Sequence, residues 1–144
     1  MRVFVLGAAA LLFLAARGEA KESAQEDPFK VTAKLIKIPG NFPPDDLYDY
    51  AYVMKYQVLG GRLDQQILLV AHYKPRRARS AISDKMKKHV SGRLTRFKEN
   101  DVHELTLTAK LKSIWRGALV DELFATDRKS VRYWCLRVDP KPAK

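Results

Sequence analysis

The sequence contains one cysteine, Cys135, so no disulfide can form within the chain. Without disulfides the fold depends on its hydrophobic core, and a chain of 144 residues is long enough to build one. Cys135 lies in the apolar stretch VRYWCLRV, beside Trp134. That setting indicates a buried and unreactive thiol, because a reactive thiolate needs basic and open surroundings.

The sequence also lacks the catalytic motifs that have a fixed spacing. It has no G-x-S-x-G nucleophile elbow and no glycine-rich phosphate loop. Carboxylates that could cleave a glycoside are present, but nothing singles out a pair among them: Asp45, Asp46, Glu104, Asp121 and Glu122. We therefore predict no catalytic residue and no cofactor.

Metal-ligand spacing is missing as well. The candidate ligands are too far apart in sequence for a zinc knuckle or for two ligands on one helical turn: His72, His89, His103 and Cys135. The carboxylates that begin at Asp45 lack the glycine and the closing glutamate of a helix-loop-helix calcium site. We therefore predict no metal site.

One long apolar run is present, at residues 3–16, and it follows a basic residue. Gly18 and Ala20 then provide the small residues that precede a signal-peptide cleavage site. The run is too short for a comfortable membrane span of about 20 residues. We predict a signal peptide over residues 1–20, cleaved after Ala20, and a secreted or periplasmic protein of single-domain size. An uncleaved membrane anchor is the alternative.

The centre of the chain predicts a β-hairpin. Two β-prone runs, residues 50–59 and 66–72, flank a turn built on Gly60 and Gly61. The first run alternates an aromatic-rich face with a wetter face. The second has no polar residue between Ile67 and Ala71, so we expect it to be covered on both faces.

Three further segments have strand-like patterns, and they are residues 29–38, 102–111 and 131–138. Residues 80–90 predict a short helix, with Ile82, Met86 and Val90 on one side because they are spaced by four. Residues 113–126 fit either a helix or a strand with a loop.

These elements predict a mainly β domain, a small five-stranded OB-like barrel with one short helix, over residues 29–139. Residues 21–28 would form a flexible leader and residues 140–144 a tail. A fold of this kind carries many functions, so it does not identify one.

Acidic residues are scarce beside basic ones, 16 against 27, and most of the imbalance lies in residues 74–98. That segment has ten lysines and arginines and a single acid, Asp84. Such a concentration attracts polyanions in a salt-dependent way, and export favours an acidic polysaccharide or envelope polymer over nucleic acid. We predict six ligand-binding residues: Arg76, Arg77, Arg79, Lys87, Lys88 and Arg93.

The aromatic residues near this segment allow two interpretations. Tyrosines such as Tyr56 and Tyr73 could offer flat faces on which sugars or bases stack. Alternatively, the tyrosines pack in the core and the charges belong to a solvated loop.

Four short blocks carry a resemblance to a known family: YQVL at 56–59, ILLVAH at 67–72, LTL at 105–107 and RYWCLRVD at 132–139. The chain resembles, over about residues 48–139, a group of small secreted bacterial β-domains found beside the O-acylation machinery of cell-surface polysaccharides. That machinery consists of membrane-bound O-acyltransferases and their SGNH-type partners. The resemblance implies an OB-like fold and a role near glycan modification, and it assigns no catalytic residue. The dense basic segment departs from the group's pattern.

We therefore expect a non-catalytic module that binds an anionic polymer or assists a glycan-modifying complex such as a membrane-bound acyltransferase. The alternative is a hydrolase or transferase of cell-surface glycans that uses a histidine such as His72 or His103. A third alternative is an interaction module that docks through a sheet edge.

Overall fold

The computed structural model describes residues 26–142, so the predicted signal peptide lies outside the described residues. The described chain is mainly β, with a six-stranded sheet. Its strands are β1 Phe29–Lys37, β2 Tyr50–Val58, β3 Ile67–Tyr73, β4 Val102–Thr108, β5 Ala118–Val120 and β6 Arg132–Pro140. Its helical pieces are the 3-10 helices η1 Arg79–Ala81 and η2 Lys85–His89 and the α-helix α2 Leu111–Ile114.

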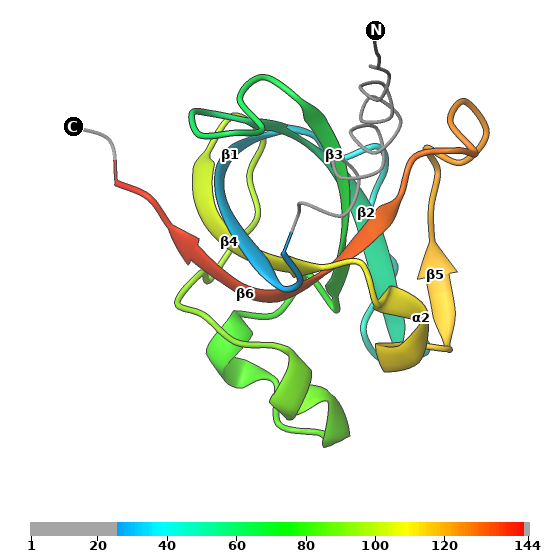
Figure 1. Ribbon diagram of the computed structural model, residues 1–144. Helices are drawn as coiled ribbons and strands as arrows, with labels where there is room; N and C mark the ends of the chain where they lie inside the picture. The colour runs from blue at the N-terminus through cyan, green and yellow to red at the C-terminus, as the bar shows by residue number, and fades with distance from the viewer. Residues whose placement is uncertain (1–25, 143–144) are drawn as a thin grey trace, which may run out of the picture.

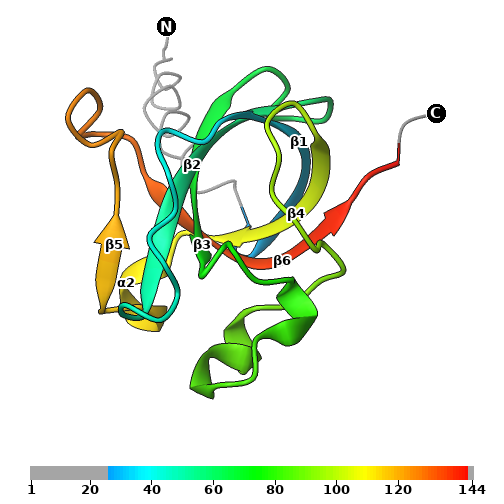
Figure 2. The same ribbon diagram turned by 180° about the vertical axis from the view of Figure 1, so that it is seen from behind.

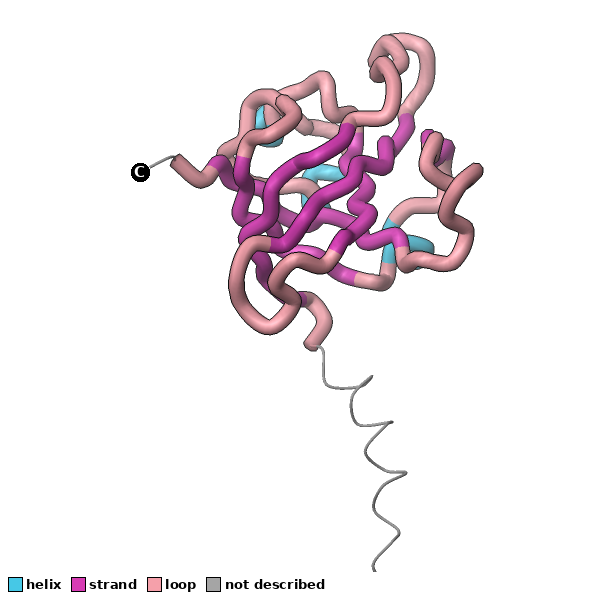
Figure 3. The backbone as a smooth tube through the Cα atoms, turned by 90° about the horizontal axis from the view of Figure 1, so that it is seen from above, coloured by secondary structure: helices cyan, strands magenta, loops and turns pink. Residues whose placement is uncertain are grey.

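The sheet closes on itself. Its order is β1-β4-β6-β3-β2-β5, and β1 also pairs with β2, so five strands form a ring and β5 adds to one side of β2 (Figure 1). The pairs are antiparallel except β3 with β6 and β2 with β5. Figure 3 shows the strands gathered at the centre with the loops and helical pieces around them. The predicted mainly β fold with a short helix is confirmed, although the sheet has six strands instead of the five that the sequence predicted, because the short strand β5 adds to β2.

The predicted hairpin is β2 and β3, and both faces of this hairpin are covered. Side chains alternate between the faces of a strand, so one set points into the ring and the other points outward. The inward set includes Tyr52, Met54, Tyr56, Leu68 and Val70. The outward set includes Ala51, Val53, Leu69, Ala71 and Tyr73, and it packs against residues that follow β3 and β4. This double cover explains the apolar sequence of β3, in which six of seven residues are buried.

The segment between β3 and β4 contains η1 and η2, and we call its residues 79–98 the basic arm. Its helical part projects from the ring in Figure 1 and again in the reverse view of Figure 2. The single helix predicted for residues 80–90 is wrong, because the Asp84 carboxylate accepts a hydrogen bond from the Met86 amide and starts a new 3-10 turn. The predicted spacing is correct, however, since Ile82, Met86 and Val90 are all buried.

Residues 113–126 and the chain just before β1 also have a defined structure. Residues 113–126 contain the end of α2 and the short strand β5. Asp27, in the predicted flexible leader, accepts a hydrogen bond of 2.9 Å from the Ala109 amide, which fixes the chain just before β1. Across residues 26–142, no helix has both the length and the apolar character needed to span a membrane.

Candidate functional site

The basic arm is an ordered part of the protein rather than a hanging loop. Apolar side chains bury at regular intervals along it: Ile82, Met86, Val90, Leu94 and Phe97. Three backbone hydrogen bonds join it to β6, from the Ser91 amide to the Leu136 carbonyl (3.0 Å), from the Val138 amide to the Ser91 carbonyl (3.1 Å) and from the Leu94 amide to the Val138 carbonyl (3.2 Å). The backbone that carries the charges between these anchors is therefore held in place at the surface.

The exposed cations of the arm form what we call the cationic surface, and its members are Lys85, Lys87, Lys88, Arg96 and Lys98. Within the described part of the chain, none of these five side chains makes an ion pair, whereas Arg93 lies 3.5 Å from a carboxylate oxygen of Asp139. Unpaired charges keep their field in solution and attract anions over a distance of about one Debye length, roughly 8 Å at physiological ionic strength.

The basic residues that precede the arm have internal partners instead. The Lys74 ammonium lies 2.7 Å from Asp49, and the Arg77 guanidinium lies 3.2 Å from Asp45. Arg76 donates from Nε to the Pro43 carbonyl at 3.0 Å. These contacts fasten the loop between β1 and β2, so Arg76 and Arg77 are partly committed to the fold.

Arg79 lies inside the protein, with 3% of its surface exposed. Its Nη2 donates to the carbonyls of Lys74 (2.8 Å) and Arg77 (3.0 Å), and its guanidinium carbon lies 5.2 Å from the centroid of the Phe97 ring. Burial lowers the pKa of Arg79 to about 10. Its predicted role on the outer surface does not fit this position, because the guanidinium is enclosed by backbone carbonyls and an aromatic ring.

Of the six predicted ligand-binding residues, only Lys87 and Lys88 belong to the cationic surface. Sequence reasoning missed Lys85, Arg96 and Lys98. The signal that could have found them is the spacing of the buried anchors, because each of these three residues is exposed and lies next to a buried side chain in the sequence, Lys85 beside Met86 and the other two beside Phe97.

The tyrosines follow the second of the two interpretations. Tyr50, Tyr52, Tyr56 and Tyr73 are buried in the core, so their rings are not available for stacking on a sugar or a base. Tyr48 is exposed, but it lies in the loop before β2 rather than on the arm.

Two histidines that are distant in sequence meet inside the ring, and we call His72 and His103 the histidine pair. The hydroxyl of Tyr56 lies 3.0 Å from Nε2 of His72 and 3.1 Å from Nδ1 of His103. Strands β2, β3 and β4 each supply one of the three residues. The other nitrogens, Nδ1 of His72 and Nε2 of His103, are buried and have no hydrogen-bond partner among the described residues.

Burial controls the charge of the histidine pair. It lowers the pKa of His72 well below its usual value, with a further lowering from Arg79, and it lowers the pKa of His103 to about 4. Both imidazoles are therefore neutral at pH 7. His72 is 1% exposed and His103 is fully buried, so neither reaches the surface where a substrate would bind.

Three of the five candidate carboxylates are occupied by structural contacts. Asp45 accepts from the Tyr50 hydroxyl, and Asp121 binds the guanidinium of Arg132 at 2.7 Å. Glu104 lies 3.3 Å from the ammonium of Lys141. Among residues 26–142, no group of three or more His, Cys, Asp or Glu side chains is arranged to hold a metal ion.

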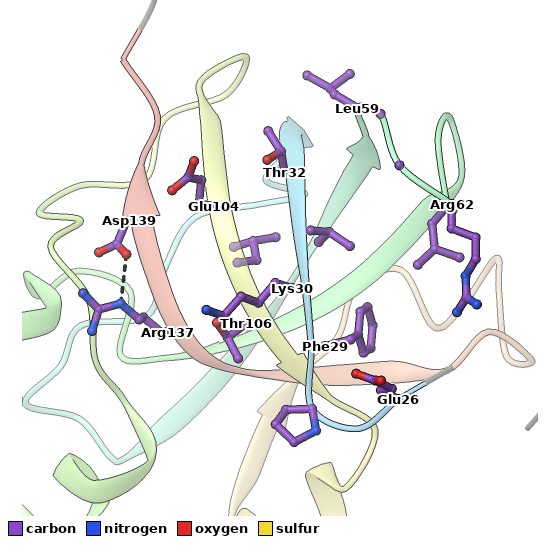
Figure 4. A pocket seen from close by; sticks show the side chains of 16 residues that line it. Glu26, Phe29, Lys30, Thr32, Leu59, Arg62, Glu104, Thr106, Arg137 and Asp139 are labelled. Atoms are coloured by element: carbon purple, nitrogen blue, oxygen red, sulfur yellow. Dashed lines mark hydrogen bonds and ion pairs between the residues drawn. The ribbon is translucent and has the colours of Figure 1, made fainter. Parts of the chain in front are cut away.

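A groove of about 960 Å³ lies beside β1, β4, β6 and the turn that joins β2 to β3. Figure 4 shows that side chains of both charge signs surround it, including Lys30, Arg62, Glu26 and Glu104. Arg137 and Asp139 bind each other across 2.9 Å. Because its charges are mixed, this groove does not offer the uniform positive field that a polyanion requires.

Comparisons with models of known protein families, with curated protein sequences and with solved structures found no match. The resemblance to β-domains of the polysaccharide O-acylation machinery therefore stays a prediction.

Proposed function

We propose that the protein is a non-catalytic module that binds an anionic polymer through its cationic surface. One observation carries the proposal: five exposed basic side chains, which make no ion pair with any residue from 26 to 142, are carried by an arm that is anchored to the sheet. Holding the charges in place lowers the conformational entropy that binding would otherwise have to remove.

The composition of the surface favours a repeating charge over a single small anion. Four of its five members are lysines, whose compact ammonium groups act as point charges and lack the two-pronged geometry of arginine. A polymer with many negative groups can contact several of them at once, and each contact releases counterions. The predicted export of the protein favours an acidic polysaccharide or another envelope polymer as the ligand, and such a role is compatible with service in a glycan-modifying complex.

The enzyme alternative has less support. It rested on His72 or His103, and both imidazoles are enclosed in the ring and bound to Tyr56. A general acid or base must come within hydrogen-bonding reach of its substrate, either directly or through one water.

Salt elution from an acidic polysaccharide resin tests the proposal. The double variant Lys87→Gln/Lys88→Gln removes two charges from η2, and Lys110→Gln/Lys112→Gln removes two exposed charges at α2 as a matched control. We expect the first variant to elute at clearly lower salt, with a salt slope reduced by roughly 0.7 to 0.9 for each lost contact. Equal shifts in the two variants would show that only total charge matters and would overturn the proposal.

A further inference from the structure

Phe97 connects the basic arm to the histidine pair. Its ring centroid lies 4.4 Å from that of His72 and 5.9 Å from that of His103. The centroid of the Phe97 ring also lies 5.2 Å from the guanidinium carbon of the buried Arg79. The arm thus packs an aromatic ring against both imidazoles, and a cation of the same arm lies close to them.

The hydrogen bonds of the pair require that at least one imidazole be neutral. Tyr56 has a single hydroxyl proton, so it can donate to one ring nitrogen while it accepts from the N–H of the other. The accepting nitrogen must be unprotonated. A proton added there would leave the hydroxyl hydrogen without an acceptor in a buried site, which is unfavourable.

The groups that face the pair supply little negative charge. They are Tyr56 from β2, which has Cys135 of β6 beside it, Arg79 from η1 toward His72, and Asp101 toward His103. Burial raises the pKa of Tyr56 well above its usual value and that of Cys135 to about 12, so both are neutral at and below pH 7. A protonated His72 would therefore be repelled by the Arg79 guanidinium, whereas Asp101 faces His103 and does not offset that repulsion.

We propose that the histidine pair is a proton-operated latch, which holds the basic arm against the ring at neutral pH and releases it at acidic pH. A protonated imidazole is stabilised by contact with water. Phe97 covers both imidazoles, and of their neighbours it is the one most easily moved away. The arm is joined to β6 by three backbone hydrogen bonds, whereas β2, β3 and β4 are tied into continuous ladders. Local unfolding begins in the segment that is attached most weakly, which here is the basic arm.

The size of the effect follows from proton linkage. An imidazole with an ordinary pKa of 6.5 in the open arm and about 4 in the closed arm, as for His103, favours the open arm by about 30-fold more at pH 5.0 than at pH 7.5. His72 acts in the same direction. The opening of the arm is inferred from these contacts alone. Opening would also move the cationic surface, and any resulting change in polyanion binding rests on the proposed function.

Hydrogen exchange measured by mass spectrometry tests the latch. After correction for the intrinsic effect of pH, we expect protection of residues 90–98 to fall by about 30-fold or more between pH 7.5 and pH 5.0. Protection of β2 should stay unchanged. Loss of protection to the same degree in both segments, or in neither, would overturn the proposal.

Two variants separate the latch from other titrations. His89→Gln removes the remaining histidine, which lies on η2 outside the pair, and the acid transition should persist. Arg79→Met removes the repelling cation, so the transition should move to lower pH. A transition lost in His89→Gln, or unmoved in Arg79→Met, contradicts the latch. If the arm opens at pH 5.0 but Lys87→Gln/Lys88→Gln leaves resin retention unchanged at pH 7.5, the latch stands and the proposed function fails.

Discussion

Replacing Gly92 with alanine tests how the basic arm is attached to β6. Gly92 has a φ of +121°, which residues other than glycine rarely adopt, and it lies against the backbone of Val138. A Cβ atom there would overlap the Val138 carbonyl oxygen and lie 2.7 Å from the carbonyl carbon and the amide nitrogen. Backbone atoms cannot move aside as the end of a flexible side chain can, so the arm must separate from β6.

The expected loss of stability follows from the contacts at this crossing. Separation weakens the three backbone hydrogen bonds between the arm and β6, each contributing about 1 kcal/mol. The unfavourable φ adds about 1 to 2 kcal/mol. We therefore expect Gly92→Ala to lower the free energy of unfolding by about 3 to 5 kcal/mol, measured by urea denaturation at pH 7.5.

Gly61→Ala is the matched control for this measurement. Gly61 has a φ of +73°, but a Cβ atom there would meet nothing within 4 Å. The control therefore carries only the conformational strain, about 1 to 2 kcal/mol. If the two variants differ by less than about 0.5 kcal/mol, the close approach of Gly92 to Val138 does not hold the arm in place and the reasoning is refuted.

Three further predictions concern the interior. Tyr56→Phe leaves two buried imidazole nitrogens without their partner and should lower the free energy of unfolding by about 2 to 4 kcal/mol in the same urea titration. Tyr52→Phe removes a buried hydroxyl whose contact with the Gly40 backbone is too poorly aligned for a well-formed hydrogen bond, and should change the free energy of unfolding by less than about 1 kcal/mol. Because the folded pKa of His103 is depressed to about 4, the unfolded chain binds more protons below pH 6.5. The free energy of unfolding should thus fall as the pH drops from 6.5 to 4, by about 3 kcal/mol from His103 alone. A free energy of unfolding that stays constant over that range would count against a buried neutral imidazole. Arg132→Met strands a carboxylate partner that is only 11% exposed and should lower the melting temperature strongly, at a cost of about 3 kcal/mol. Arg137→Met removes a half-exposed guanidinium from Asp139, which keeps the Arg93 amide as a donor, and should cost less than about 1 kcal/mol.

The strands could be predicted because their patterns are local. Alternation in β2, the apolar run of β3 and the turn at Gly60 and Gly61 each depend on residues within about ten positions of one another. The spacing of Ile82, Met86 and Val90 predicted the correct buried set even though the backbone is not an α-helix. Burial follows the spacing of apolar residues, whereas the type of helix depends on caps such as Asp84.

The contacts inside the ring could not be predicted in the same way. His72 reaches Tyr56 across the β2–β3 hairpin, but His103 lies on β4, and only the pairing of β1 with both β2 and β4 brings it to Tyr56. Arg79 was expected outside because arginines are seldom fully buried without a charged partner. Its burial depends on carbonyls and an aromatic ring that the folded arm supplies, and no sequence pattern describes them.

The place of β6 between β3 and β4 has a consequence for synthesis of the protein. A nascent chain that has not yet reached residues 132–140 can pair its first four long strands, but the facing edges of β3 and β4 still lack their shared neighbour. Such unpaired edges readily recruit strands from other chains. The sheet therefore cannot be completed until β6 has left the ribosome. Chains interrupted before β6 should be prone to aggregate.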